Sequence, residues 1–174
     1  MANFYQVKVS NINKETHDSV SISFDIGTQH LKEFNFTPGQ YIVIKANING
    51  DDCRRSYSIC SSKNEILTVA IKKVENGKMS TYINEKLQVG DTVEIQPPQG
   101  NFKLENINLS NTRKFVAFAA GSGITPILSM IKEISINEKN TQFLLFYSNK
   151  TKSDVMFSSP VSYTHLTLPT KRIV

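Results

Sequence analysis

Hydrophobic and polar residues alternate in six short runs over the N-terminal part of the chain. The runs are FYQVKVSNI, SVSISFDI, YIVIKA, RRSYSIC, ILTVAIKKV and DTVEIQ, and turn signals such as TPGQ, NGDD, SSKNE and VGD separate them. Alternation with a period of two is typical of half-buried strands bounded by turns. We therefore predict an all-β, six-stranded antiparallel barrel with Greek-key connections.

One segment of this barrel region, GKMSTYINEKL, has helical spacing instead of alternation. The apolar side chains that recur at this spacing are Met79, Tyr82, Ile83 and Leu87. Ser80 or Thr81 is suited to cap the amino end of such a helix. One short helix is therefore expected after the fifth strand.

The pattern changes near residue 103. After the polar connector NFKLENINLSNTRK, the runs FVAFAAG, ITPILSMIKEISI and QFLLFYS indicate a buried strand, an amphipathic helix and a second buried strand. The helix stripe is Ile127, Leu128, Ile131 and Ile134, with Lys132 and Glu133 outside it. We therefore predict a barrel domain over residues 1–102, followed over residues 113–159 by the first part of an α/β domain with a parallel sheet.

Composition and charge narrow the function classes. The formal net charge of +5 falls to +3, with 18 basic and 15 acidic residues, when Lys171 and Arg172 in the acid-free tail are left out. This excess is weak evidence for nucleic-acid binding. The start MANFYQVKVS has no signal-peptide pattern, and no apolar run reaches the length of a membrane span. We expect a cytoplasmic protein with no membrane partner.

Cysteine and histidine give no metal-binding pattern. Cys53 and Cys60 are too few for a disulfide scaffold or a four-thiolate cluster, and His17, His30 and His165 stand alone without ligand spacing. We expect structural roles for all five and no metal site.

The run RRSYSIC combines a guanidinium, an aromatic ring and hydroxyls in one strand. Alternation places Arg55 and Tyr57 on one face and Ser58 on the other. One interpretation is an edge strand with a solvated arginine and an aromatic ring packed on the core. The other is a ligand that lies across the end of the strand and meets several of these side chains.

Two glycine-containing turns are candidate anion sites. In AAGSGITP, Gly121 and Gly123 permit a sharp turn and close ligand approach, and Pro126 fits the first turn of a helix whose free amides favour phosphate. Because Pro126 replaces the third glycine of the dinucleotide fingerprint, a tight strand-to-helix connection is the alternative. In GKMS, Gly77 precedes further amides and hydroxyls, and an ordinary capped helix is the alternative.

Five segments together resemble one family. FTPGQYIVI, RRSYSICSS, VENGKMSTYI, VGDTVEIQPPQGNF and FAAGSGITPILSM, in this order, resemble the ferredoxin-NADP reductase family, especially the reductase components that serve bacterial oxygenases. The resemblance runs from the N-terminus to about Phe157. It implies that the barrel binds FAD and that the α/β domain binds a nicotinamide nucleotide.

The resemblance also implies residue roles. Arg55 contacts the FAD pyrophosphate, while Tyr57 lies against the isoalloxazine ring and Ser58 bonds near its reducible nitrogen, which makes the last two the candidate catalytic residues. The other cofactor-binding residues implied are Ala70, Ile71 and Lys72 beside the ring, Lys78, Met79 and Ser80 at a second pyrophosphate turn, Gly121, Gly123, Thr125 and Pro126 at the nicotinamide nucleotide, and Asn149 and Lys150 near its adenosine ribose. Lys150 and Lys152 either favour the 2'-phosphate of NADPH or are simply exposed to solvent, so the preference between NADH and NADPH is left open.

The implied activity is that of an NAD(P)H-dependent FAD-containing reductase. It passes a hydride from NADH or NADPH to FAD and then single electrons to an iron–sulfur acceptor, which is a ferredoxin, an oxygenase component or a further domain of the same protein. One alternative is an FAD-binding fragment without turnover. Another is a basic barrel that binds single-stranded nucleic acid, which would need exposed aromatic rings along a basic groove.

The C-terminal segment differs from the rest of the chain. VSYTHLTLPTKRIV can be encoded by DNA that resembles a transposase-based sequencing adapter. We therefore expect residues 160–174 to be a non-native tail and the native sequence to continue differently. The further parallel strands and the Cys-Gly segment of the family are not found here, and we expect the α/β part to be incomplete and to expose apolar strand faces.

Overall fold

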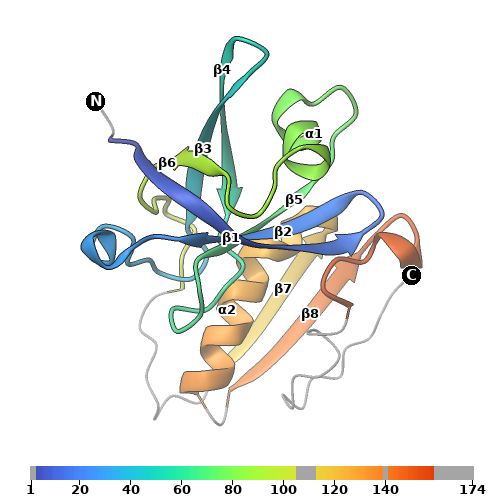
Figure 1. Ribbon diagram of the computed structural model, residues 1–174. Helices are drawn as coiled ribbons and strands as arrows, with labels where there is room; N and C mark the ends of the chain where they lie inside the picture. The colour runs from blue at the N-terminus through green and yellow to red at the C-terminus, as the bar shows by residue number, and fades with distance from the viewer. Residues whose placement is uncertain (1–2, 105–112, 139–140, 159–174) are drawn as a thin grey trace.

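The computed structural model describes residues 3–104, 113–138 and 141–158 (Figure 1). The barrel region contains β1 (Tyr5–Thr16), β2 (Ser19–Asp25), η1 (Thr28–His30), β3 (Tyr41–Ile48), β4 (Asp51–Ser58), β5 (Thr68–Lys72), α1 (Lys78–Glu85) and β6 (Thr92–Ile95). The second region contains β7 (Lys114–Ala120), η2 (Gly121–Gly123), α2 (Ile124–Asn137), β8 (Gln142–Ser148) and η3 (Lys152–Asp154). The expected tail and His165 lie outside the described residues.

The six strands of the barrel region form one antiparallel sheet in the order β4-β3-β6-β1-β2-β5. Alternate side chains of the strands meet inside it, and Phe24, Ile22, Ile42, Ile44 and Ile95 are among the fully buried ones. The predicted six-stranded barrel with one short helix is confirmed. Aromatic rings that a nucleic-acid groove would require on the surface, such as Phe24, Phe34 and Phe36, are buried instead.

The β3–β4 hairpin shows why the strands turn where they do. Asn49 and Gly50, within the predicted turn signal NGDD, have φ values of 55° and 90°. A two-residue hairpin turn with both central residues at positive φ matches the twist of the strands, and asparagine followed by glycine tolerates it best. The turn extends β4 back to Asp51, three residues before the predicted run begins.

The second region is the predicted strand, helix and strand. β7 and β8 pair in parallel from Lys114 opposite Gln142 to Ala120 opposite Ser148, and α2 connects them. The buried side of α2 includes the predicted stripe of Ile127, Leu128, Ile131 and Ile134. The predicted start of an α/β parallel-sheet domain is thus confirmed.

One detail of the predicted helix stripe is wrong. Glu133 was expected on the solvent side of α2, yet only 5% of it is exposed. The loop before β5 packs against this flank, and the Lys63 amide donates to Glu133 Oε2 (3.0 Å), while Asn137 Nδ2 donates to Oε1 (3.0 Å). α2 is therefore covered by the barrel as well as by its own sheet.

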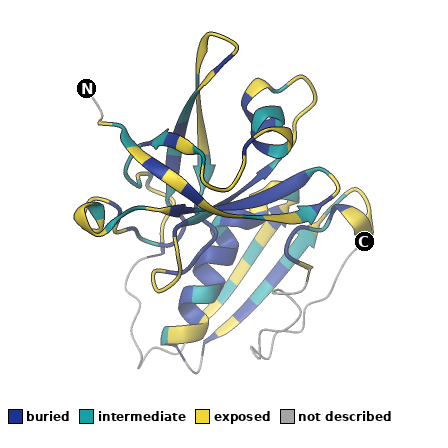
Figure 2. Cartoon of the chain, viewed as in Figure 1, coloured by how far each residue is buried: buried dark blue, intermediate teal, exposed yellow. Residues whose placement is uncertain are grey.

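The two faces of the β7–β8 sheet differ in burial (Figure 2). α2 covers one face, and Leu145 is 1% exposed there. On the other face Val116 is 60% and Phe118 76% exposed, as expected for apolar strand faces left uncovered. Within the described residues, no helix is long and apolar enough to cross a membrane.

Candidate functional site

The barrel closes where the two end strands of its sheet, β4 and β5, meet. Closure is short, because only Ile59 and Val69 pair and the Cys60 amide donates to the Thr68 carbonyl (2.9 Å). Beyond this bridge no further β4–β5 pair forms among the described residues. The diverging strands therefore leave an open seam in the barrel wall.

A pocket of about 580 Å³ lies at this seam, and we call it the seam pocket. Its walls come from β4, β5, the start of α1 and the β7–α2 turn. The predicted site residues that line it are Arg55, Tyr57, Ser58, Ala70, Ile71, Lys72, Lys78, Met79, Ser80, Gly123, Thr125 and Pro126. Segments that are far apart in the sequence thus meet in one cavity.

The open edge of β4 explains how side chains of opposite faces reach the same pocket. All four consecutive residues from Arg55 to Ser58 line it, although alternation sends Tyr57 and Ser58 to different faces. β4 pairs with β3 along one edge only, so its other edge borders the pocket with backbone and with side chains of both faces. The alternation of residues in the sequence does not reveal which edge of a strand is left unpaired.

Arg55 carries the positive charge of this wall. Its Nη1 donates to the Arg54 carbonyl (2.7 Å), and it pairs with no carboxylate among the described residues. The neighbouring Arg54 differs, because its Nη2 pairs with Asp52 Oδ2 (2.7 Å). The Arg55 guanidinium therefore keeps donors available for an anion, and its planar fork matches a phosphate.

Tyr57 presents a half-buried aromatic ring beside Arg55. Burial raises the pKa of its phenol to about 12, although the Arg55 charge acts in the opposite direction. The phenol is therefore neutral at physiological pH and does not serve as a general base there. Its ring offers a flat surface for stacking.

The amino end of α1 supplies unpaired amides. Gly77 occupies the N-cap without a side-chain cap, and the amides of Lys78, Met79 and Ser80 donate to no described residue. A Cβ on Gly77 would lie 2.5 Å from Ser80 Oγ, so a larger residue here would have to displace the Ser80 hydroxyl. Free amides at a helix start favour a bound anion.

The expected N-cap at Ser80 or Thr81 is wrong, because α1 begins three residues before Thr81, at Lys78. The Ser80 hydroxyl is used within the turn, where it accepts from the Val74 amide (3.1 Å) and donates to the Gly77 carbonyl (3.2 Å). Lys78 forms an ion pair with Asp51 on the β3–β4 hairpin. The backbone of this turn, rather than the Ser80 hydroxyl, is therefore free to bind.

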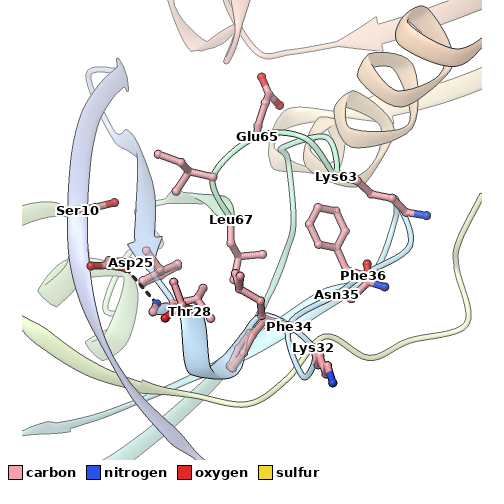
Figure 3. Close-up of a pocket in the computed structure, with 15 residues that line it drawn as sticks. Ser10, Asp25, Thr28, Lys32, Phe34, Asn35, Phe36, Lys63, Glu65 and Leu67 are labelled. Atoms are coloured by element: carbon pink, nitrogen blue, oxygen red, sulfur yellow. Dashed lines mark hydrogen bonds between the residues drawn. The ribbon is translucent and has the colours of Figure 1, made fainter.

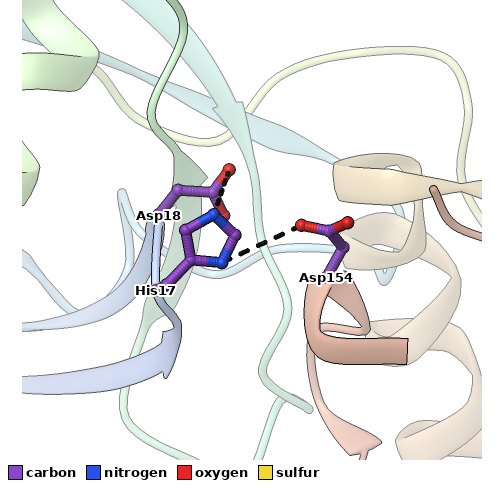
Figure 4. Close-up of side chains that lie close together, drawn as sticks. All are labelled: His17, Asp18 and Asp154. Carbon is purple, nitrogen blue, oxygen red and sulfur yellow. Dashed lines mark ion pairs between the residues drawn. The ribbon is translucent and has the colours of Figure 1, made fainter. Parts of the chain in front are cut away.

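A charged cluster of His17, Asp18 and Asp154 lies between the barrel and the second region (Figure 4). Lys72 on β5 connects the seam pocket to this cluster. Its Nζ lies 3.3 Å from Asp18 Oδ2 and 3.5 Å from Asp154 Oδ1. His17 lies 3.9 Å from each of the same two carboxylates. The cluster therefore ties η3 to the β1–β2 turn.

His17, Asp18 and Asp154 bring three ligand-type side chains within 4.8 Å of one another. Sequence spacing missed this group because Asp154 is remote in the chain from the other two. The Lys72 ammonium lies within ion-pair distance of both carboxylates, which makes the group an ion-pair cluster. We assign it no metal.

The β7–α2 turn forms the opposite wall of the seam pocket. Gly121 has a φ of 49°, and its carbonyl accepts a hydrogen bond from the Tyr147 hydroxyl (3.0 Å). Thr125 Oγ1 donates to the Ser122 carbonyl (2.9 Å). A Cβ on Gly123 would meet no atom within 4 Å, so this glycine leaves room on the pocket side.

The predicted residues that the seam pocket does not include are Gly121, Asn149 and Lys150. Asn149 and Lys150 follow β8, at the same carboxyl edge of the β7–β8 sheet as the glycine turn. Ser56, Val74 and Ser122 line the pocket but were not predicted. Ser56 and Ser122 lie inside motifs that the sequence did reveal, whereas Val74 carries no chemical signal.

Contacts between α2 and the barrel hold the two walls together. Ser129 Oγ donates to the Ser61 carbonyl (2.6 Å), and Lys132 pairs with Glu65 (3.0 Å). Both partners lie in the loop that connects β4 to β5, the strands that border the seam. The spacing between the walls is therefore set by contacts close to the pocket.

Comparisons with known proteins agree with this geometry. The family model "Oxidoreductase FAD-binding domain" matches residues 6–104, and "Oxidoreductase NAD-binding domain" matches residues 118–172. The chain is 38% identical over 159 residues to a subunit of 1,2-phenylacetyl-CoA epoxidase from Escherichia coli (strain K12), covering 90% of this chain and 44% of that protein. It is 31% identical to an NADPH oxidoreductase of Mycobacterium tuberculosis, covering 89% of this chain and 41% of that protein.

Solved structures show the same fold. Phthalate dioxygenase reductase superposes with a TM-score of 0.73 at 27% identity, over 89% of this chain and 46% of that one. Ferredoxin-NADP+ reductase from Plasmodium falciparum with 2'P-AMP gives a TM-score of 0.78 at 24% identity, over 92% and 68% of the two chains. The chain spans less than half the length of the curated relatives named above.

Proposed function

The chain belongs to the oxidoreductase family with an FAD-binding domain, and we propose that its seam pocket holds FAD for electron transfer from NAD(P)H to an iron–sulfur acceptor. The observation that carries this proposal is the meeting of RRSYS, GKMS and the AAGSGITP turn around one cavity. Each motif alone has an ordinary structural explanation. Their convergence at an open barrel seam supports a bound dinucleotide.

The residues present fit FAD. A pyrophosphate needs positive charge and N–H donors, and Arg55 together with the unpaired amides of Lys78 and Met79 supplies both. An isoalloxazine ring needs a flat apolar neighbour, which the half-buried Tyr57 provides. Ala70 and Ile71 add a buried edge strand at the same cavity.

When bound, FAD supplies the ability to accept a hydride and to release electrons singly. The protein positions the reacting partners and sets their electrostatic environment. In this proposal Tyr57 and Ser58 are the catalytic residues, because they line the cavity beside the ring position. The Ser58 hydroxyl can both donate and accept a hydrogen bond, and the Tyr57 phenol beside it is neutral.

The nicotinamide nucleotide is assigned to the β7–α2 wall. Gly123, Thr125 and Pro126 line the cavity, and Gly121 shapes the turn that presents them. Asn149 and Lys150 lie at the same carboxyl edge of the β7–β8 sheet, as ligands of parallel sheets commonly do. The proposal includes no preference between NADH and NADPH.

The acceptor is assigned by chemistry. Phthalate dioxygenase reductase is described as transferring electrons from pyridine nucleotides to [2Fe-2S], and other relatives are a ferredoxin reductase component of a monooxygenase and an electron transfer component of a dioxygenase. We assign this protein an iron–sulfur acceptor of the same kind, carried by a ferredoxin, an oxygenase component or a further domain. We also assign this protein the cytoplasmic location that is expected from its sequence.

Reconstitution with FAD tests the proposal. The purified chain is mixed with excess FAD, freed of unbound flavin and examined by absorbance, and we expect about one FAD per chain. Protein that retains no flavin would reject the proposal. Anaerobic mixing of the flavin-loaded chain with NADH or NADPH then measures flavin bleaching, and retained FAD without bleaching would indicate an FAD-binding module without turnover.

A further inference from the structure

A second pocket, of about 770 Å³, lies at the opposite end of the β2–β5 ladder from the seam pocket. It is bordered by the end of β2, by residues 26–36 and by residues 63–67, and we call it the loop pocket. No described residue lines both pockets. Its volume falls within the range of roughly 300–1,000 Å³ that small-molecule sites occupy.

The floor of the loop pocket is apolar (Figure 3). Phe24, Phe34 and Leu67 belong to the barrel core and border the pocket from beneath. Leu31 and Ile66 lie at the rim and are 61% and 62% exposed. An apolar group that entered here would remove these side chains from water, which favours binding in proportion to the area covered.

The charged groups around this floor differ in their partners. Asp25 Oδ1 accepts a hydrogen bond from the Gly27 amide (3.0 Å), and Glu65 accepts one from the Ser62 amide (2.7 Å) and pairs with Lys132. Lys32 and Lys63 also line the pocket, and their ammonium groups bond to no described residue. In Figure 3 both lysines lie on the side opposite Asp25.

We propose that the loop pocket binds an apolar carboxylate. The hydrocarbon part lies on the phenylalanine and leucine floor, and the carboxylate lies between Lys32 and Lys63. The charge follows from these partners, because Glu65 is already paired with Lys132 and Asp25 lies on the opposite side of the pocket from the two lysines (Figure 3), which have no partners among the described residues. Both ammonium groups are exposed to water and would repel a cationic ligand.

Calorimetric titration of the 174-residue chain with octanoate and decanoate, below their micelle-forming concentrations, tests the proposal. Each added methylene buried on the floor should tighten binding about fourfold, so decanoate should bind about 15 times more tightly than octanoate. Decyltrimethylammonium has the same tail with the opposite charge and should bind at least about tenfold more weakly than decanoate. The titrations are repeated with FAD present and should give the same affinities.

Variants locate the binding. Asn35 is exposed and lines the pocket, so Asn35→Trp should fill the cavity and abolish decanoate binding without disturbing the core. Lys32→Ala combined with Lys63→Ala should weaken binding about tenfold. Lys14→Ala is the matched control, because Lys14 is an exposed lysine near the other end of the β1–β2 ladder and should leave the affinity unchanged.

Several outcomes would overturn the proposal. They are the absence of saturable decanoate binding, equal binding of the cationic amphiphile, loss of binding when FAD is added, or full affinity in the Asn35→Trp variant. Circular dichroism of each variant checks that it is folded.

Discussion

The barrel and the β7–α2–β8 region differ in how completely each encloses its own apolar residues. The barrel closes its sheet around Ile22, Phe24 and Ile42, which are at most 1% exposed. The second region covers only one face of its sheet and leaves Phe118 76% exposed on the other. The wall of the seam pocket formed by β4, β5 and α1, where we propose that FAD binds, therefore belongs to a self-contained fold. The wall formed by the β7–α2 turn, where we propose that the nicotinamide nucleotide binds and which we call the nucleotide wall, depends on contacts with the barrel.

Two polar contacts on different sides of the second region support the nucleotide wall. Ser129, near the middle of α2, bonds to the Ser61 carbonyl, and Asp154 pairs with Lys72 beside the pocket. The first contact is buried, and the second is partly exposed to solvent. We expect the barrel wall to keep its geometry without its neighbour, and the nucleotide wall to lose its geometry when these contacts are lost.

Core substitutions should have the largest effects, and these effects should differ between the two regions. Ile22→Ala in the barrel and Leu145→Ala in β8 remove similar buried side chains, and each should cost about 2–5 kcal/mol of local stability. Ile22→Ala should abolish FAD binding, whereas Leu145→Ala should preserve it and lose amide protection mainly in β7 and β8. Hydrogen exchange measures amide protection in the two variants, and titration with FAD measures their affinity. Equal loss of FAD binding in Ile22→Ala and Leu145→Ala would show that the two regions fold as one unit.

Adjacent arginines provide a sharper test of the barrel wall. Arg55→Ala should weaken FAD binding by about 1.5 to 3 kcal/mol, because it removes a charge-assisted phosphate contact. Arg54→Ala is the matched control, since Arg54 is paired with Asp52 and does not line the pocket. Arg55→Lys should give an intermediate affinity, because it keeps the charge and loses the planar fork. Equal affinities for all three variants would return Arg55 to a solvated surface role.

Acid should loosen the second region through Asp154. Hydrogen bonds from Thr151, with the nearby Lys72 charge, hold the pKa of the Asp154 carboxyl below its ordinary value of 3.8. A lowered pKa contributes stability that is present above the ordinary value and is lost as the pH falls through the lower folded value. Amide protection of residues 151–157 should therefore fall below about pH 4.

Asp154→Asn should remove most of this pH dependence, and Asp25→Asn, at the far end of the barrel, is the control. An acid response of residues 151–157 that persists unchanged in Asp154→Asn would assign it to another carboxylate.

The smallest effect is expected from Gly123→Ala. The added methyl group meets no protein atom and the residue has an ordinary φ of −62°, so stability should stay within about 1 kcal/mol of the original value. The methyl group nevertheless occupies the nucleotide side of the seam pocket, so NAD(P)H should bind a few-fold more weakly while FAD affinity is unchanged. Weakened FAD binding would place the flavin against this wall instead.

The predictable parts of the fold follow local periodicity. Alternation located all six barrel strands, and helical spacing located α1 and α2, because burial of one face imposes these periods on the sequence. The burial of Glu133 could not be predicted, since it depends on a loop about seventy positions away that packs on the same helix. The start of α1 was placed too late because Ser80 bonds to its own turn instead of capping the helix.

The residues of the candidate site could be predicted where the side chains that can bind a ligand lie within a recognisable sequence motif. RRSYS, GKMS and AAGSGITP each carried an unusual residue pattern, and the seam pocket joins them. The ion-pair cluster of Lys72, Asp18 and Asp154 was not predictable, because Asp154 reaches the other two only after the two regions pack together. The loop pocket was missed for a related reason, since residues 26–36 and 63–67 are mostly irregular connections without a period.

Hydrogen exchange with and without FAD tests most directly whether the open seam of the barrel is the flavin site. We predict that FAD slows exchange at residues 55–58 of β4, at residues 70–72 of β5 and at residues 77–80 before and within α1, while residues 26–36 and 63–67 exchange as before. Protection confined to the loop pocket, or bound FAD that protects neither β4 nor the start of α1, would contradict this assignment.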